Sequence, residues 1–250
     1  MRVIVCVKQV MQLGDEVEFT DDGLDVDPDY VDAALNEWDS FATEEALQLK
    51  ERLGGEVVVV TCGERGAEAA LRRCLAMGAD RAIRVEGAGR DPFAVARALA
   101  DVVRGESPDL VLCGVQSSDS GQAATGTVLA ELLELPRLAV VVKLDVDGGG
   151  GRAVVNRELE GGLLDRVEVD LPAVLTIQTG INQPRYANLR AIKLAEQVEV
   201  DVRQAAAGGQ EAFRVRRMFV PEKGEGAEML GRDPAEVARR IAEIVKERLA

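Results

Sequence analysis

Histidine is absent from this sequence, and aromatic residues are scarce. Among the 250 residues there is no histidine, and Phe, Trp and Tyr together make up 3%. Without an imidazole the chain cannot form a Ser-His-Asp triad or a histidine-ligated zinc site. The four cysteines show no CxxC spacing, so a structural zinc would need scattered thiols to converge: Cys6, Cys62, Cys74 and Cys113. We therefore expect no metal site and no triad-type catalysis.

Long hydrophobic runs are missing as well. The apolar runs have the length of single strands, whereas a membrane-spanning helix needs about 18 or more apolar residues. The N-terminus begins with a strand-like segment in place of a signal or transit segment. Lys and Arg are dispersed in a chain of net charge −14, which argues against nucleic-acid binding. We expect a soluble cytoplasmic protein, bacterial or archaeal, that binds no nucleic acid and has no membrane span.

The usual signatures of nucleotide-dependent enzymes and hydrolases are also missing. No GxGxxG follows the first predicted strand, and the chain contains neither a GxxxxGK[ST] P-loop nor a GxSxG elbow. An ATP-pyrophosphatase-like enzyme would carry a Ser-Gly-Gly-x-Asp-Ser loop after that strand, where this sequence has Lys8-Gln9-Val10-Met11. The cysteines have no neighbouring base to generate a thiolate, so we interpret them as small strand-end side chains. Binding is a better hypothesis than catalysis.

The sequence does contain a regular alternation of apolar strand-like runs and helical segments. Arg2–Val10 is nearly continuous apolar and β-branched, which is typical of a strand buried on both faces of a parallel sheet. Right-handed crossovers predict an α/β fold with a doubly wound, mostly parallel sheet of strand order 3-2-1-4-5 and a switch point between strands one and four. The other predicted strands are Val57–Thr61, Arg81–Val85, Leu110–Cys113 and Ala139–Asp147, and the helices end at Leu53, Met77, Arg104 and Leu133.

The stretch Leu110–Gly126 has the character of a phosphate site. A buried strand leads into a Gly/Ser/Asp loop, Gly114–Gly121, and a helix opens near Ala123, so free N–H groups and a positive helix end meet at the switch point. No Lys or Arg lies in this stretch. A bound anion would therefore depend on N–H donors, hydroxyls and the helix dipole. An ordinary βα loop is the alternative, because such loops are also rich in Ser and Gly.

Several predicted segments lie outside the sheet. A hairpin is expected about Asp21–Gly23, and another joins Ala153–Leu159 to Arg166–Val169. After a short strand at Ala173–Thr176, the loop around residues 177–191 carries exposed apolar and aromatic residues. We expect a nucleotide-binding domain at residues 1–204, followed at 205–250 by a linker and an arm.

The arm itself consists of three predicted parts. Ala205–Gln210 is typical of a linker, Phe213–Val220 is strand-like, and Asp233 starts a capping box on a helix that runs to Leu249. This tail is too small to fold alone. The apolar face of its helix must pack on the body of this chain or on another subunit.

Several motifs together resemble the β subunit of electron transfer flavoproteins. The resemblance covers nearly the whole chain, from the VxVCVKxV pattern of the first strand to the tail. Its most specific parts lie in the second hairpin and the loop that follows. The matching segments are Asn36 with Ala46–Lys50, Ala76–Asp80, Val155–Gly162, Leu171–Thr176 and Asn182–Tyr186.

The resemblance implies an electron carrier subunit and leaves open whether the chain is an enzyme by itself. Its α-subunit partner would hold a redox-active FAD and move electrons from flavin-dependent dehydrogenases to an acceptor oxidoreductase, while the β chain buries a structural AMP. The Ala123–Thr125 amides and the Thr125 hydroxyl would lie near the phosphate. Carried over by position, the AMP site would comprise Cys6, Asn36, Glu37, Trp38, Asp39, Cys62, Gly114, Val115, Gln116, Ser117, Ser118, Asp119, Ser120, Gly121, Gln122, Ala123, Ala124 and Thr125.

The resemblance also implies partner-recognition residues. In the family the loop at 177–191 is the recognition loop, whose apolar anchor, here Ile181, inserts into the dehydrogenase; Pro184, Arg185 and Tyr186 accompany it. Glu158 falls on a glutamate that pairs with an α-subunit arginine and helps control movement of the flavin domain. The alternatives are a loop packed on its own domain and an ordinary surface ion pair worth at most about 1 kcal/mol.

Two departures from the family pattern bear on these roles. The lysine-rich run past the recognition loop is replaced by Leu194–Gln197, which leaves the identity of the docking partner open. The acidic residue of the hairpin signature is Asp165, after Leu163-Leu164, which leaves the hairpin register open.

Two other functions remain as alternatives. In the bifurcating branch of the family the β chain carries a second FAD in place of AMP and oxidises NADH. Thr125 favours the AMP form, and the Pro-Asp-Thr expected of that branch is absent after the first strand. A stand-alone adenine-nucleotide-binding protein of stress type would need neither the hairpin nor the recognition loop nor the tail.

Overall fold

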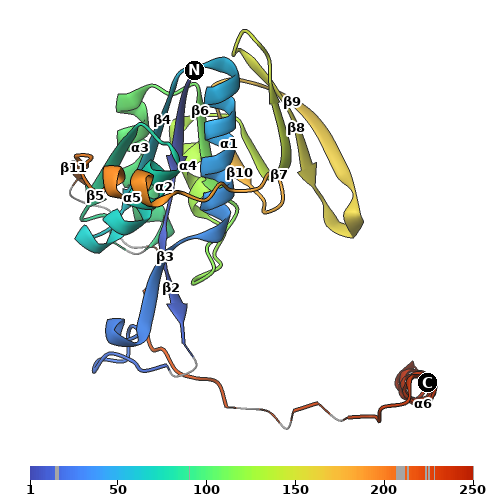
Figure 1. Ribbon diagram of the computed structural model, residues 1–250. Helices are drawn as coiled ribbons and strands as arrows, with labels where there is room; N and C mark the ends of the chain where they lie inside the picture. Colours follow the sequence, from blue (N-terminus) through green and yellow to red (C-terminus); the bar gives the residue numbers. More distant parts are fainter. Residues whose placement is uncertain are drawn as a thin grey trace. The chain divides into compact units, whose positions relative to one another are not determined.

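The computed structural model describes residues 1–14, 17–89, 91–206, 212, 214–222, 224, 226–227 and 229–249. The chain divides into two compact units, Met1–Arg217 and Met218–Ala250. Figure 1 shows the strands and helices of both. The first unit contains the sheet and every residue of the candidate site, so each unit is described by itself.

A nine-stranded sheet forms the centre of the first unit, in the order β11-β5-β4-β1-β6-β10-β7-β8-β9. Neighbouring strands are parallel except for the pairs β7–β8 and β8–β9. The fold is thus mixed α/β with a mostly parallel sheet, as predicted. The strands are β1 Arg2–Cys6, β4 Glu56–Cys62, β5 Arg81–Glu86, β6 Leu110–Gly114, β7 Arg137–Val146, β8 Arg152–Glu158, β9 Leu164–Asp170, β10 Ala173–Ile177 and β11 Asp201–Gln204.

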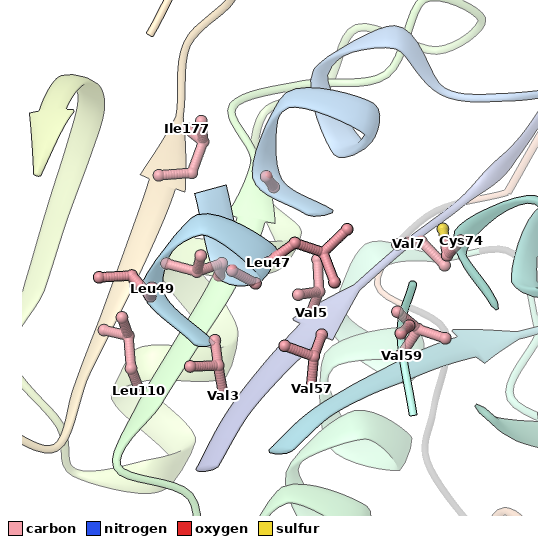
Figure 2. Packing of buried hydrophobic residues seen from close by; sticks show 14 of the residues in the cluster. Val3, Val5, Val7, Leu47, Leu49, Val57, Val59, Cys74, Leu110 and Ile177 are labelled. Atoms are coloured by element: carbon pink, nitrogen blue, oxygen red, sulfur yellow. The ribbon is translucent and has the colours of Figure 1, made fainter. Parts of the chain in front are cut away.

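Helices cover both faces of the sheet because successive strand residues point to opposite sides. Val3 and Val5 belong to one buried cluster, with residues of α1 and α2, and Ile4 belongs to a second cluster, with residues of α3 and α4. Figure 2 shows Val3, Val5 and Val57 on the side of Leu47 and Leu49. The helices are α1 Glu37–Leu53, α2 Glu68–Met77, α3 Pro92–Glu106, α4 Thr125–Leu133 and α5 Leu189–Ala195, with 3-10 turns at Pro28–Tyr30, Arg65–Ala67 and Glu160–Gly162.

The observed strand order departs from 3-2-1-4-5 at its last position. The first four predicted strands lie in the expected order, as β5-β4-β1-β6, but β10 separates β6 from β7. All five residues of β10 are buried, whereas β7 has exposed and half-buried positions. A run that is apolar on both faces is suited to the interior of a parallel sheet, and the longer, partly exposed β7 lies further out and pairs with the hairpin.

The first predicted strand is also shorter than expected. β1 ends at Cys6, and β2, Gln9–Leu13, pairs with β3, Val31–Leu35, in a separate antiparallel sheet that extends away from the body in Figure 1. The break occurs where the N–H of Lys8 donates to a carboxylate, that of Asp39, in place of a strand neighbour. Within the hairpin predicted about Asp21–Gly23, the structure has a single bridge between Phe19 and Val26.

The end of the chain holds α6, Pro234–Leu249. Asp233 Oδ1 accepts hydrogen bonds from the N–H groups of Ala235 and Glu236, at 2.8 and 3.0 Å, which confirms the predicted cap. Residues 214–220 have no regular secondary structure, in contrast to the predicted strand-like arm. Phe213 and residues 207–210 of the predicted linker lie outside the described residues. Among the helices of the described chain, none has the length and apolar character to cross a membrane.

Candidate functional site

The candidate site lies where β6 ends and the chain runs through a loop into α4. Gly114 is the last residue of β6, and a Cβ there would overlap the carboxylate of Asp39 and the Cβ of Trp38. Only glycine leaves room for this close approach between β6 and α1. The start of α1 is thereby placed directly against the base of the loop.

Asp39 connects two strand ends across the predicted switch point. One carboxylate oxygen accepts from the N–H of Lys8 at 2.7 Å, and the other accepts from the N–H of Gly114 at 2.9 Å. The residue is 4% exposed. Burial raises the pKa of Asp39 to about 7, although the N–H donors favour the charged form. The carboxylate therefore fixes the ends of β1 and β6 relative to each other.

Asn36 holds the next part of the loop. Its side chain donates from Nδ2 to the carbonyl of Gln116 at 2.8 Å and accepts through Oδ1 from the N–H of Ser118 at 3.2 Å. Asn36 stands at the N-cap position of α1 but makes no cap hydrogen bond, because its amide is engaged with the loop. An amide that both donates and accepts fixes one backbone orientation for residues 116–118.

Lys8 is a site residue that the sequence analysis missed. Its Nζ lies 2.6 Å from Asp119 Oδ1 and within 3.3 Å of the hydroxyls of Ser117 and Ser120. Burial alone would raise the pKa of Asp119, but the bond to Lys8 brings this pKa below its ordinary value. More than one hundred residues separate Lys8 from the loop, so a search for cations near Leu110–Gly126 could not find it. The one indication in the sequence that Lys8 could belong to the site was its position just after the first predicted strand.

The first turn of α4 offers backbone donors. Ala124 occupies the N-cap position and supplies no side-chain cap, and Ala123 before it has a φ of 49°. The first N–H groups of a helix have no partner within the helix, and the helix dipole makes this end positive. Thr125 is half-buried at the start of the helix, and Gly126 behind it is buried close to Thr176. This helix end can hold an anion through N–H groups and a hydroxyl.

The three cysteines near the site are buried or partly buried thiols. Cys6 and Cys113 are in register on adjacent strands, and a hydrogen bond between them, together with burial, raises the pKa of Cys6 well above its ordinary value. Burial raises the pKa of Cys62, at the end of β4, to about 12. With their pKa values raised, the thiols of Cys6 and Cys62 are protonated at neutral pH and can serve only as apolar contacts for a ligand.

The predicted site residues are thus brought to one edge of the sheet, but they are not equivalent. Glu37 is exposed, and Trp38 donates from Nε1 to Gln178 Oε1 at 2.9 Å, just after β10. The loop residues from Ser118 to Ala123 are exposed. Side chains that connect the loop to the rest of the fold include those of Lys8, Asn36 and Asp39.

The loop after β10 is fixed on α1 by charged side chains. The guanidinium of Arg185 binds both oxygens of Glu44, at 2.8 and 2.9 Å, and reaches Glu51 at 2.6 Å. Asn182 donates to the carbonyl of Phe41 and to Glu45. Glu44 is itself almost fully buried. A bidentate pair of this kind gives the loop a defined orientation.

The exposed residues of this loop differ from the predicted anchor. Ile181 and Pro184 are half-buried, and Ile181 packs against the core cluster on the α1 side. Tyr186 is 91% exposed, and Leu189, which the sequence analysis did not single out, is 78% exposed. Glu158 is exposed at the end of β8, beside an ion pair between Arg157 and Asp165.

Known proteins resemble this chain over nearly its whole length. The electron transfer flavoprotein domain family matches residues 23–207. The electron transfer flavoprotein subunit beta of Methylophilus methylotrophus is 46% identical, over 99% of this chain and 98% of its own length. The same subunit of Syntrophomonas wolfei is 36% identical, over 98% of this chain and 96% of its own, and that of Sus scrofa is 36% identical over 82% of each.

The family match includes the loop after β6, the hairpin and the loop after β10. Identity of this extent over this share of both chains, together with the α/β architecture, agrees with the family suggested by the sequence motifs. The chain belongs to the electron transfer flavoprotein family, as a β subunit.

Proposed function

We propose that this chain binds AMP as a structural ligand at the loop after β6 and pairs with an α subunit that holds FAD. The single observation that carries the proposal is the loop itself. Asp39 and Asn36 hold it from a distant part of the chain, and it leads into a helix end whose N–H groups have no side-chain cap. Such a helix end binds phosphate groups readily.

The residues fit a nucleoside monophosphate. The phosphate would lie at the Ala123–Thr125 amides and the Thr125 hydroxyl, and the thiols of Cys6 and Cys62 would offer apolar contact to the base. Lys8 already pairs with Asp119, so the nearby side chains contribute little net charge. A preorganised set of N–H donors can hold a phosphate without a dedicated cation.

The electron-transfer chemistry belongs to the FAD of the proposed α subunit. When bound there, FAD would supply the redox chemistry between flavin-dependent dehydrogenases and an acceptor oxidoreductase. This chain would contribute binding surfaces: the recognition loop toward the dehydrogenase, Glu158 toward the α subunit, and the arm at 205–250 packing on that subunit. Ile181 would be the apolar anchor, with Tyr186 and Leu189 exposed beside it.

The first experiment is to purify the native complex, denature it and quantify the released nucleotides against protein. One AMP and one FAD per heterodimer would support the proposal. Two FAD and no AMP would favour a bifurcating subunit instead, and purification of the chain without any α subunit would favour a stand-alone nucleotide-binding protein. Release of no nucleotide attributable to this chain would contradict the site.

A matched pair of variants assigns the nucleotide to this loop. Thr125→Val removes the hydroxyl at the start of α4 and should lower the AMP content of the purified complex, because about 1 kcal/mol of hydrogen bonding is lost. Thr127→Val makes the same change two residues further along the helix, at an exposed position bonded to Arg137. The AMP content of this control should stay at the wild-type level, and equal losses in both variants would count against the assignment.

A further inference from the structure

The loop after β6 has two differently supported parts. Its base, Gly114 to Ser118, is held by the buried residues Asp39 and Asn36. Its tip, Asp119 to Ala123, is exposed. Side-chain bonds from outside the loop reach this tip through Lys8, whose ammonium binds Asp119 and Ser120 as well as Ser117.

We propose that the Lys8–Asp119 ion pair is a latch that holds the loop tip in place and so sets the rate at which the nucleotide leaves the site. This inference rests on the proposed function and names its regulation. The latch connects the tip to the segment that carries Lys8. This segment is held in place by the pairing of β1 in the sheet and by the hydrogen bond from the N–H of Lys8 to Asp39. Breaking the ion pair frees the tip and leaves the base of the loop held by Asn36 and Asp39.

The charges at the tip favour a latch over a direct phosphate ligand. Lys8 and Asp119 neutralise each other at 2.6 Å. If the ammonium left Asp119 for a phosphate, an unpaired carboxylate would remain near a second anion, and two like charges at short distance repel each other. Lys8 is therefore a positioning residue, which acts on the ligand through the loop.

The expected effect is small because the pair is partly exposed. The side chains of Lys8 and Asp119 are 45% and 25% exposed. Ion pairs of this exposure correspond to changes of about two- to fivefold in an equilibrium or rate. Salt screens them, so the latch should weaken as ionic strength rises.

The test uses the purified full-length chain, in complex with its α subunit, and two readouts. The first is the rate of AMP release after dilution, and the second is hydrogen exchange at the amides of residues 115–122. Lys8→Met and Asp119→Asn should each increase the rate of AMP release and the rate of hydrogen exchange by about two- to fivefold. The double variant should be no faster than either single variant. Added salt should speed release from the wild type but not from the variants.

Lys50→Met provides the matched control. Lys50 pairs with Asp80 at the same distance, 2.6 Å, with side chains that are 28% and 36% exposed, and neither residue belongs to the site. This control should release AMP at the wild-type rate.

Four outcomes would overturn the latch. Slower AMP release in Asp119→Asn with faster release in Lys8→Met would make the lysine a direct phosphate ligand. Additive effects in the double variant would show that the two residues act independently, and release that is equally salt-sensitive in wild type and variants would show that the pair plays no part. If the wild type carries no AMP, the proposed function fails, and unchanged loop exchange in Lys8→Met would separately overturn the latch.

Discussion

At the scale of single residues, Asp39 has the largest structural role in the site. Its carboxylate accepts from two backbone N–H groups that lie 106 residues apart in the chain, those of Lys8 and Gly114. A buried carboxylate is costly unless it is well hydrogen-bonded, and the cost appears in its raised pKa. The residue that positions the loop thus carries a charge that burial makes unfavourable.

This pKa predicts a pH dependence of stability. The folded protein retains the Asp39 proton up to about pH 7, whereas an ordinary aspartate releases it near 3.8. The folded state therefore binds more protons between these values, and the contribution of Asp39 to the free energy of unfolding falls as pH rises from about 4 to 7, by on the order of 4 kcal/mol at most. Urea unfolding of the wild type and of Asp39→Asn at a series of pH values measures this contribution of Asp39.

The variant isolates this contribution because asparagine does not titrate. The stability advantage of the wild type over Asp39→Asn should shrink as pH rises through that window. Asp101→Asn is the control, since Asp101 is exposed and pairs with Arg104, a neighbour on its own helix. A constant difference between wild type and Asp39→Asn across the window would refute the raised pKa.

Arg185 gives a second prediction at this scale. Its guanidinium binds Glu44 through two nitrogens and Glu51 through a third atom, which a lysine cannot reproduce. Arg185→Lys should destabilise the loop after β10 by about 1 to 2 kcal/mol, a value reduced for the partial exposure of Arg185. Limited proteolysis at residues 180–188 should become faster. Arg190→Lys, at an exposed position of α5, should leave the cleavage rate unchanged.

At the scale of elements, the contact between β6 and α1 depends on the absence of a side chain. Gly114→Ala places a methyl group against Asp39 and Trp38 and should lower the free energy of unfolding by about 1 to 3 kcal/mol. Gly105→Ala, in α3, meets no atom within 4 Å of the added carbon and should raise it by up to about 1 kcal/mol. Denaturant unfolding should thus give changes of opposite sign in the free energy of unfolding for the two Gly→Ala variants. Changes of the same sign would contradict the packing of α1 on β6.

Much of this element arrangement could be predicted from the sequence, because buried strands and capped helices are local patterns. The cap at Asp233, the end of α4 at Leu133 and the four neighbouring strands from β5 to β6 follow from such patterns. The place of β10 does not, since an apolar run on its own does not say which two strands it lies between. Lys8 was missed for the same reason, because its partners are distant in the sequence.

At the scale of the whole molecule, the C-terminal unit has an apolar surface that needs a partner. None of the described residues of α6 is buried, and Ile241 and Val245 are both 49% exposed. A helix of this kind normally buries its apolar stripe against another element. The proposed α subunit would provide that surface.

Replacing this stripe tests the prediction. Ile241→Asp combined with Val245→Asp should reduce co-purification with the α subunit, because two apolar side chains that should be buried on association become charged. The free energy of unfolding of the first unit should not change. Glu243→Ala, on the same helix, should leave co-purification intact, and retention of the complex by the double variant would contradict this role of α6.

One helix, α1, meets both loops on which the proposed activity depends. Its first residues hold the loop after β6 through Asn36 and Asp39, and its next two turns hold the loop after β10 through Glu44 and Glu45. A displacement of α1 would therefore change both loops together. If AMP strengthens binding of a dehydrogenase by way of this helix, then by thermodynamic reciprocity the bound dehydrogenase strengthens retention of AMP by the same factor. A ligand that takes no part in electron transfer would then be an allosteric effector of the partner that delivers the electrons.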